Sequence, residues 1–248
     1  MEQKVFFEGE FGKICGVLHK YDENSEIVII VHGFSSNKDS SAAILARSLN
    51  EIGINALRID FDNRGESELD FEEGVSIPNY IKQIESTIDY CKSLGYNKIS
   101  LVGTSFGGIV AFSTAAKHPE LNRLLLRVPV VDFQKHLERR YGKDKLGQYK
   151  LDNKIPFERR EGDKIYFNYN AYESAKGHSM KENAHKIEMP TLIIQGTEDE
   201  ALDWTWIKDV IDLFPNAELK IIEGADHSLS VNGDFSKGLE YAIEFFKN

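Results

Sequence analysis

Cysteine, proline and long apolar runs are all scarce in this sequence. Its 248 residues include only two cysteines, Cys15 and Cys91, and six prolines. Two cysteines do not make a disulfide framework, which favours a reducing, cytoplasmic location. The longest aliphatic run, Ile27 to Val31, is far too short to span a bilayer. The N-terminus shows no charged segment followed by an apolar one, so we expect no signal peptide.

Positive charge is also scarce. Lysine and arginine total 30 against 40 aspartates and glutamates, which gives a net charge of −10 without any basic block. This balance predicts that the protein does not bind nucleic acid. His178 and His185 are seven residues apart and lack cysteine or acidic partners at ligand spacing, so no metal is expected. There is no glycine-rich phosphate motif, so no nucleotide cofactor is expected either.

What the sequence does contain is a regular alternation of strand and helix patterns. Two short runs around Gly9 to Gly12 predict an opening β-hairpin. Later β-rich runs resemble strands covered on both faces, at 27–31, 54–59, 99–102, 124–131, 191–194 and 217–222. Apolar residues recur at helical spacing in 77–91, 204–214 and 235–246. This alternation predicts an α/β fold, with a mostly parallel eight-stranded sheet flanked by helices.

One segment interrupts the alternation. Residues 131–188 contain no clear strand–helix unit and are rich in charged and aromatic side chains. Long irregular inserts within compact domains are often active-site lids. We therefore expect a core made of residues 1–130 and 189–248, with an inserted lid, or cap, over 131–188. The alternative is a solvated excursion whose aromatic side chains only pack on the body of the domain.

The pentapeptide Gly103-Thr104-Ser105-Phe106-Gly107 has the pattern G-x-S-x-G. It stands where the strand pattern of 99–102 meets a helix expected over 108–117. A serine on such a sharp turn has its hydroxyl clear of the backbone, and the flanking glycines leave room for the strained conformation. The start of the helix also provides unpaired N–H groups near the hydroxyl. This context indicates a nucleophilic serine.

A nucleophilic serine needs a base, and the base needs an orienting acid. His227 follows the strand pattern of 217–222 in a glycine-containing loop, from which an imidazole can reach over the serine. Asp199 comes soon after the strand pattern of 191–194 and is the preferred acid, with Glu198 or Asp203 as alternatives. Catalytic groups gather at the carboxyl ends of parallel strands. We therefore predict Ser105, Asp199 and His227 as the catalytic set.

Acyl transfer also needs donors for the negative charge that develops on the carbonyl oxygen. The backbone N–H of Phe106, directly after the serine, is one candidate. The backbone N–H of Phe34, in the loop after 27–31, is the second. We interpret His32, in the same loop, as a residue that fixes the loop rather than as a base. The sequence assigns no side chain to substrate binding.

Taken together, the motifs resemble the α/β-hydrolase superfamily, and most closely its bacterial feruloyl (cinnamoyl) esterase-like carboxylesterases and serine aminopeptidase-like hydrolases. The resemblance rests on the hairpin, the serine pentapeptide and the segments 32–34, 60–67, 196–199 and 224–227. It implies Ser105 as nucleophile, Asp199 as acid, His227 as base, and the amides of Phe34 and Phe106 as oxyanion hole. The chain departs from the family at 63–65, where Gly-His-Gly is frequent, and in the lid. The resemblance therefore does not extend to the substrate.

The leading hypothesis is a cytoplasmic serine esterase, a carboxylesterase that forms an acyl-enzyme with a small-molecule ester. The same residues would serve a thioesterase acting on acyl carriers or an aminopeptidase for small peptides. The lid acids Glu158, Glu161, Asp163 and Glu173 would suit the free amine of a peptide. A non-catalytic binding protein on the same fold is disfavoured by the intact serine, histidine and acid. A homodimer is compatible with the sequence.

Overall fold

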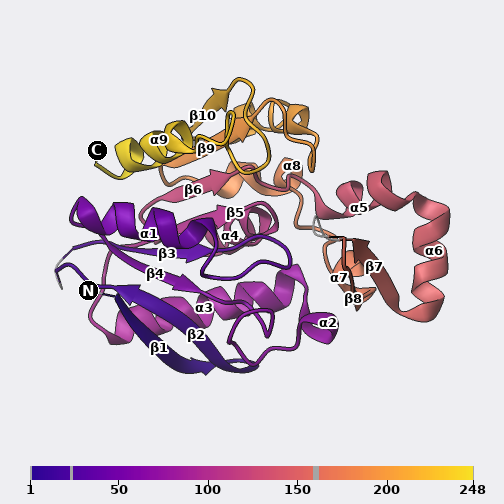
Figure 1. The fold of residues 1–248 in the computed structure, drawn as a ribbon, viewed down its shortest axis with the longest axis horizontal. Helices are drawn as coiled ribbons and strands as arrows, with labels where there is room; N and C mark the ends of the chain where they lie inside the picture. Colours follow the sequence, from indigo (N-terminus) through magenta and orange to yellow (C-terminus); the bar gives the residue numbers. More distant parts are fainter. Residues whose placement is uncertain (1, 23–24, 159–161, 248) are drawn as a thin grey trace.

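An eight-stranded sheet forms the centre of the structure, a computed structural model that describes residues 2–22, 25–158 and 162–247 (Figure 1). Its strand order is β1-β2-β4-β3-β5-β6-β9-β10, and all neighbours from β4 onward are parallel. The strands are β1 (Glu2–Gly9), β2 (Gly12–His19), β3 (Ile27–Val31), β4 (Asn55–Ile59), β5 (Ile99–Thr104), β6 (Leu124–Arg127), β9 (Thr191–Gly196) and β10 (Ala217–Ile222). The predicted fold class is confirmed.

The strands follow directly from their sequence patterns. Every residue of β3, β4 and β9 is buried, as expected for strands with helices on both faces. The antiparallel hairpin of β1 and β2 turns between Gly9 and Gly12, and Gly12 has a φ of 98° that favours glycine. The hairpin extends the sheet at one edge, where β2 pairs antiparallel with β4.

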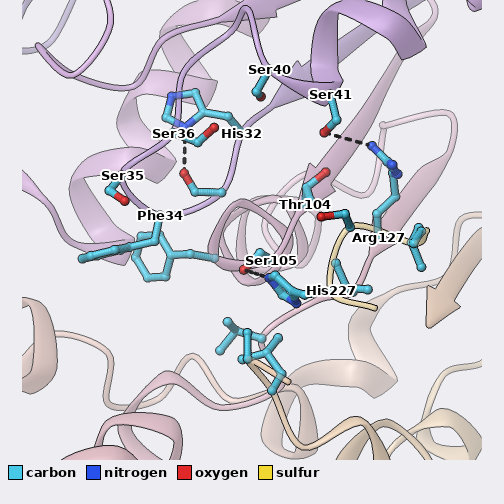
Figure 2. Close-up of a pocket in the computed structure, with 18 of the residues that line it drawn as sticks. His32, Phe34, Ser35, Ser36, Ser40, Ser41, Thr104, Ser105, Arg127 and His227 are labelled. Atoms are coloured by element: carbon cyan, nitrogen blue, oxygen red, sulfur yellow. Dashed lines mark hydrogen bonds between the residues drawn. The ribbon is translucent and has the colours of Figure 1, made fainter. Parts of the chain in front are cut away.

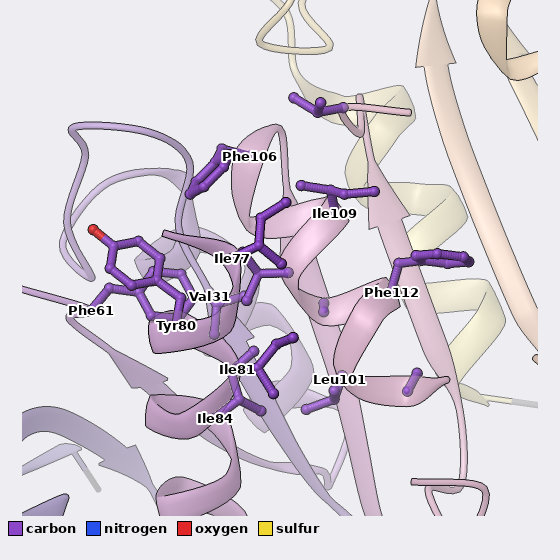
Figure 3. Close-up of a cluster of buried hydrophobic side chains, with 14 of the residues drawn as sticks. Val31, Phe61, Ile77, Tyr80, Ile81, Ile84, Leu101, Phe106, Ile109 and Phe112 are labelled. Atoms are coloured by element: carbon purple, nitrogen blue, oxygen red, sulfur yellow. The ribbon is translucent and has the colours of Figure 1, made fainter. Parts of the chain in front are cut away.

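Helices cover both faces of the sheet and create two apolar cores. On one face, α1 (Ser41–Glu51) and α9 (Ser236–Lys247) pack over Val28, Ile30 and Val102. On the other, α3 (Ile77–Ser93) and α4 (Phe106–Ala115) pack over the alternate strand residues. Figure 3 shows this second core, where side chains of α3 and α4 meet. All ten residues of α4 are buried, which holds the helix that follows Ser105 firmly in place.

Residues 131–188 are more regular than the sequence predicted. They form α5 (Phe133–Tyr141), α6 (Lys143–Asp152), the antiparallel pair β7 (Lys154–Glu158) and β8 (Lys164–Asn168), α7 (Asn170–Glu173), α8 (Met180–Asn183) and η1 (Ala184–Lys186). The prediction of an irregular segment is therefore wrong. These elements are short, and they pack mainly on each other rather than on the sheet. Most of this insert stands to one side of the sheet (Figure 1).

Three predicted boundaries also need correction. The expected helix over 204–214 is two short 3-10 helices, η2 (Trp204–Ile207) and η3 (Ile211–Leu213). Val210 leaves the helical region with a φ of −122°, and Pro215 favours an extended Phe214. The helix after the serine begins at Phe106 rather than Gly108, because the turn at Ser105 leads into it directly. β6 ends at Arg127, since Val128 has a φ of 41° and Pro129 follows.

The short helix α2 (Phe71–Gly74) completes the described secondary structure before α3. Within residues 2–22, 25–158 and 162–247, each helix is too short or too polar to serve as a membrane span.

Candidate active site

Ser105 lies on a strained turn between β5 and α4. Its φ of 56° and ψ of −119° are unusual for any residue other than glycine. The turn requires the two flanking glycines. A Cβ atom at Gly103 would lie 2.3 Å from the carbonyl oxygen of Gly107, and one at Gly107 would lie 2.2 Å from the carbonyl oxygen of His32. The packing of β5 against α4 and of α4 against the His32 loop therefore holds the serine in this conformation.

The structure brings the imidazole of His227 to this serine. The Nε2 atom of His227 lies 3.0 Å from Oγ of Ser105, and its Nδ1 atom lies 2.9 Å from both carboxylate oxygens of Asp199. His227 comes from the loop after β10 and Asp199 from the loop after β9, so the three residues meet at the carboxyl edge of the sheet. Figure 2 shows Ser105 and His227 facing each other.

The carboxylate of Asp199 is held in place by its surroundings. Its side chain is fully buried and accepts hydrogen bonds from the backbone N–H groups of Ala201 and Leu202 and from the side-chain amide of Gln195. Burial by itself raises the pKa of Asp199, but the hydrogen bonds, led by that of His227, bring this pKa below its ordinary value. The carboxylate therefore stays ionised beside the imidazole. Gln195, the last residue but one of β9, was not singled out from the sequence.

The alternative acids point elsewhere. Asp203 caps η2 through the backbone N–H of Thr205 and pairs with Arg139 at 3.1 Å. Glu198 is exposed. Asp226, next to the histidine, accepts hydrogen bonds from the backbone N–H groups of its own loop. Among these carboxylates, only that of Asp199 contacts the imidazole of His227.

Two backbone N–H groups lie near the serine without a protein acceptor. Within the described part of the chain, the amides of Phe34 and Phe106 donate no hydrogen bond. Phe106 is the first residue of α4, where N–H groups have no helical partner. Gly33 is so close that a Cβ atom there would lie 3.2 Å from Cβ of Ser105, which places the amide of the next residue, Phe34, beside the nucleophile.

His32 fixes the loop that carries Phe34, as expected. Its Nε2 atom accepts a hydrogen bond from the backbone N–H of Phe61 at 3.1 Å. Its Nδ1 atom lies 2.8 Å from the carbonyl oxygen of Gly33, so the ring proton sits on Nδ1. Both ring nitrogens are therefore committed to the backbone, and His32 has no free nitrogen for proton transfer.

A cavity of about 590 Å³ surrounds Ser105 and His227 and crosses the edge of the sheet. On the α4 side its walls are apolar side chains, most of them aromatic, and we call this part the aromatic arm: Phe34, Phe106, Phe133, Leu137, Phe157 and Phe167. On the α1 side lies a second part, the α1 arm: Ser40, Ser41, Leu45, Arg127, Val128 and Leu229. Phe34 and Arg127 stand on opposite sides of Ser105 in Figure 2.

Phe34 lies at the centre of the aromatic arm. Its ring contacts five other phenylalanine rings at centroid distances of 5.0 to 6.3 Å. Three of them, Phe133 on α5, Phe157 on β7 and Phe167 on β8, belong to the insert. The insert therefore supplies one wall of the cavity, and its aromatic side chains line the site.

One cluster of side chains has the chemistry of a metal site, but its carboxylates already pair with a lysine. Cys15, Asp60 and Glu66 offer ligand atoms within 4.8 Å of one another. The buried ammonium of Lys38 lies 3.0 Å from Asp60 and 2.8 Å from Glu66, so the charge of both carboxylates is balanced by this lysine. The cluster is a structural ion-pair network.

Comparisons with known proteins agree with this geometry. Residues 22–153 match the family described as serine aminopeptidase, S33. The chain is 28% identical to monoacylglycerol lipase abhd6-A of Xenopus laevis over 276 residues, which cover 92% of this chain and 77% of that protein.

Solved structures share the fold. Est1E from Butyrivibrio proteoclasticus with ferulic acid bound has a TM-score of 0.80 at 21% identity and covers 98% of each chain. The α/β hydrolase GrgF from Penicillium sp. sh18 has a TM-score of 0.83 at 18% identity, covering 100% of this chain and 98% of that one. These similarities confirm the predicted α/β-hydrolase fold.

Proposed function

Because this chain belongs to the serine aminopeptidase S33 family of the α/β-hydrolase superfamily, we propose that Ser105, His227 and Asp199 form its catalytic triad. The chain is a carboxylic ester hydrolase, in keeping with the lipase and esterase names of its relatives. The observation that carries the triad is the unbroken contact from Asp199 through His227 to Ser105, at 2.9 and 3.0 Å.

The proposed reaction uses each of these contacts. His227 takes the proton of Ser105 as Oγ attacks the ester carbonyl, and Asp199 stabilises the imidazolium that forms. The amides of Phe34 and Phe106 donate to the oxyanion; the loss of one such donor typically costs about 100- to 1,000-fold in rate. His227 then protonates the departing alcohol, which leaves the acyl group on Ser105. A water molecule deprotonated by His227 releases the acid and restores the serine.

The aromatic arm favours an apolar or aromatic group on the ester. Six apolar side chains, five of them phenylalanine, line it next to the nucleophile. Est1E, which has the same fold, binds ferulic acid. We therefore propose a feruloyl-esterase-like carboxylesterase in which the insert, residues 131–188, acts as a lid over the aromatic arm.

An aminopeptidase is less well supported. Binding of a peptide's free amine needs a carboxylate in the cavity, and no acidic side chain among the described residues lines it. Glu158 and Asp163 are exposed, and Glu173 pairs with Lys150 at 2.6 Å. Glu161 lies outside the described residues. A thioesterase would use the same triad, so only substrates distinguish it from an esterase.

A panel of matched substrates tests the proposal. The purified protein should hydrolyse para-nitrophenyl butyrate and methyl ferulate faster than a butyryl thioester or an aminoacyl anilide. Ser105→Ala should abolish turnover of all four, because Oγ of Ser105 is the only hydroxyl among the described residues that is hydrogen-bonded to His227. Hydrolysis only of the anilide would replace the esterase with a peptidase, and full activity of Ser105→Ala would remove the triad.

A further inference from the structure

The α1 arm of the cavity contains a cation that the proposed chemistry does not use. Arg127 is the last residue of β6, and its carbonyl oxygen accepts the backbone N–H of Ser105 at 2.9 Å. It therefore stands one strand away from the nucleophile, at the same level of the sheet. Its side chain lines the cavity on the α1 side (Figure 2).

Among the described residues, no carboxylate lies within ion-pair distance of Arg127, and its one hydrogen-bond contact is Oγ of Ser41 at 3.5 Å. The side chain is partly shielded from solvent, and burial lowers the pKa of Arg127 to about 10. Arginine remains charged at neutral pH, so the arm holds a positive charge that no carboxylate of the described residues balances.

The surroundings reinforce this charge. The only formally charged side chains of described residues in the cavity are Arg127 and Arg140, although the whole chain carries −10. Arg140 is exposed and lies over the Phe157 ring at 4.6 Å, on the lid. The α1 arm also includes the start of α1, where the hydroxyl of Ser40 makes no cap hydrogen bond. The positive end of this eleven-residue helix favours an anion at the same place.

The backbone next to Arg127 is strained, and hydrogen bonds hold it in position. Val128, the next residue, has a φ of 41°, which is rare for a β-branched residue, and it is buried. Its N–H donates to the carbonyl oxygen of Ile194, and the N–H of Val130 donates to that of Ser105. The chain therefore turns sharply after Arg127 and is held by hydrogen bonds on both sides, which fixes the backbone of Arg127 relative to the nucleophile.

We propose that Arg127 binds a carboxylate carried by the substrate ester, whose apolar part occupies the aromatic arm. The planar guanidinium suits a carboxylate because it can donate two parallel hydrogen bonds. This inference rests on the proposed ester hydrolysis and adds the substrate class, an ester with one negatively charged end. The carboxylate belongs either to the acyl part or to the alcohol part of the ester.

Two matched pairs of esters test the inference on the unmodified protein. Monomethyl suberate with methyl octanoate places the carboxylate on the acyl part. Para-butyryloxybenzoate with para-cresyl butyrate places it on the alcohol part. In one of the two pairs, we expect kcat/KM to favour the anionic ester by about 10- to 100-fold, the range for a hydrogen bond to a charged group. Turnover of the neutral esters reports separately on the proposed esterase activity.

Variants locate the preference. Arg127→Gln should reduce the ratio of anionic to neutral kcat/KM to about one or below, and Arg127→Lys should give an intermediate ratio. Arg140→Gln removes the other arginine of the cavity and should keep the preference. If Arg127→Gln does not fold, the ratio of anionic to neutral kcat/KM in Arg127→Lys tests the inference instead. A neutral ester favoured in both pairs, or a preference that follows Arg140 instead, would overturn the inference while leaving the esterase proposal standing.

Discussion

At the scale of single residues, strain is concentrated around the serine. Of the six described residues other than glycine with positive φ, four line the cavity: Ser35, Ser105, Val128 and Leu229. Each such conformation costs about 1 to 3 kcal/mol, which the packing around it must offset. The packing that maintains these strained conformations also holds the serine, the backbone of Arg127 and the histidine loop in fixed relative positions.

The sequence could identify the serine because its glycine spacing is demanded locally, by close approach of backbone atoms. It preferred Asp199 as the acid but left Glu198 and Asp203 as alternatives. Glu198, Asp199 and Asp203 are nearly equivalent along the chain, and they differ only in what surrounds them in three dimensions. Asp199 alone meets the amides of Ala201 and Leu202, the side chain of Gln195 and the imidazole of His227.

Replacement of Asp199 tests this distinction. Asp199→Asn preserves the shape of the side chain but removes the charge that stabilises the imidazolium and selects its tautomer. We expect kcat for para-nitrophenyl butyrate to fall by about 10⁴-fold, as for a triad aspartate elsewhere. Thermal unfolding of the variant shows whether the fold is retained.

Asp203→Asn is the matched control, because Asp203 caps η2 and pairs with Arg139 away from the imidazole. It should remain within a few-fold of the unmodified protein. A large loss in Asp203→Asn with a small one in Asp199→Asn would transfer the role of the acid to Asp203.

At the scale of elements, the core was predictable and the insert was not. Buried strands and amphipathic helices carry strong periodic patterns, and β3, β9 and α3 appear where those patterns lie. The hairpin of β7 and β8 has only five residues in each strand, with few that must be apolar. Its pattern is too weak to recognise from the sequence. The 3-10 helices at 204–213 have helical spacing but not the length or continuity of an α-helix.

The insert hairpin should limit the size of the group in the aromatic arm. Phe157, on β7, is half-buried and its ring lies 5.0 Å from that of Phe34. Phe157→Ala should open the arm and raise kcat/KM for ethyl decanoate relative to ethyl butyrate by about ten-fold. That is the value of roughly two buried methylene groups. Initial rates over a series of ethyl esters provide the measurement.

Tyr166→Ala provides the control on the same hairpin, since Tyr166 is 41% exposed and does not line the cavity. Its chain-length profile should match that of the unmodified protein. Equal profiles for Phe157→Ala and the unmodified protein would mean that the ester does not use the aromatic arm.

At the scale of the whole molecule, the site depends on strand order. Ser105, Asp199 and His227 follow β5, β9 and β10. Along the chain, Ser105 and His227 are 122 residues apart. Parallel strands bring their carboxyl ends to one edge, so the convergence could be expected from the alternating pattern. The lining of the cavity could not, because Arg127 and the phenylalanines come from both faces of the sheet and from the insert.

The net charge acts at this scale as well. The molecule as a whole is acidic, but the charged side chains among the described lining of its cavity are all arginines. The cavity is therefore a favourable place for an anionic group to bind. The outer surface of the molecule weakly repels such a group. The net charge of the chain therefore does not predict the charge of the cavity, since the local charge differs from the average.

Covalent labelling of the serine tests the central claim most directly. A fluorophosphonate reacts with a serine whose hydroxyl is deprotonated by a neighbouring base and whose oxyanion is stabilised. Peptide mass spectrometry should find one adduct per chain, on Ser105, and no adduct in Ser105→Ala. An adduct on another residue, or undiminished labelling in Ser105→Ala, would contradict the account.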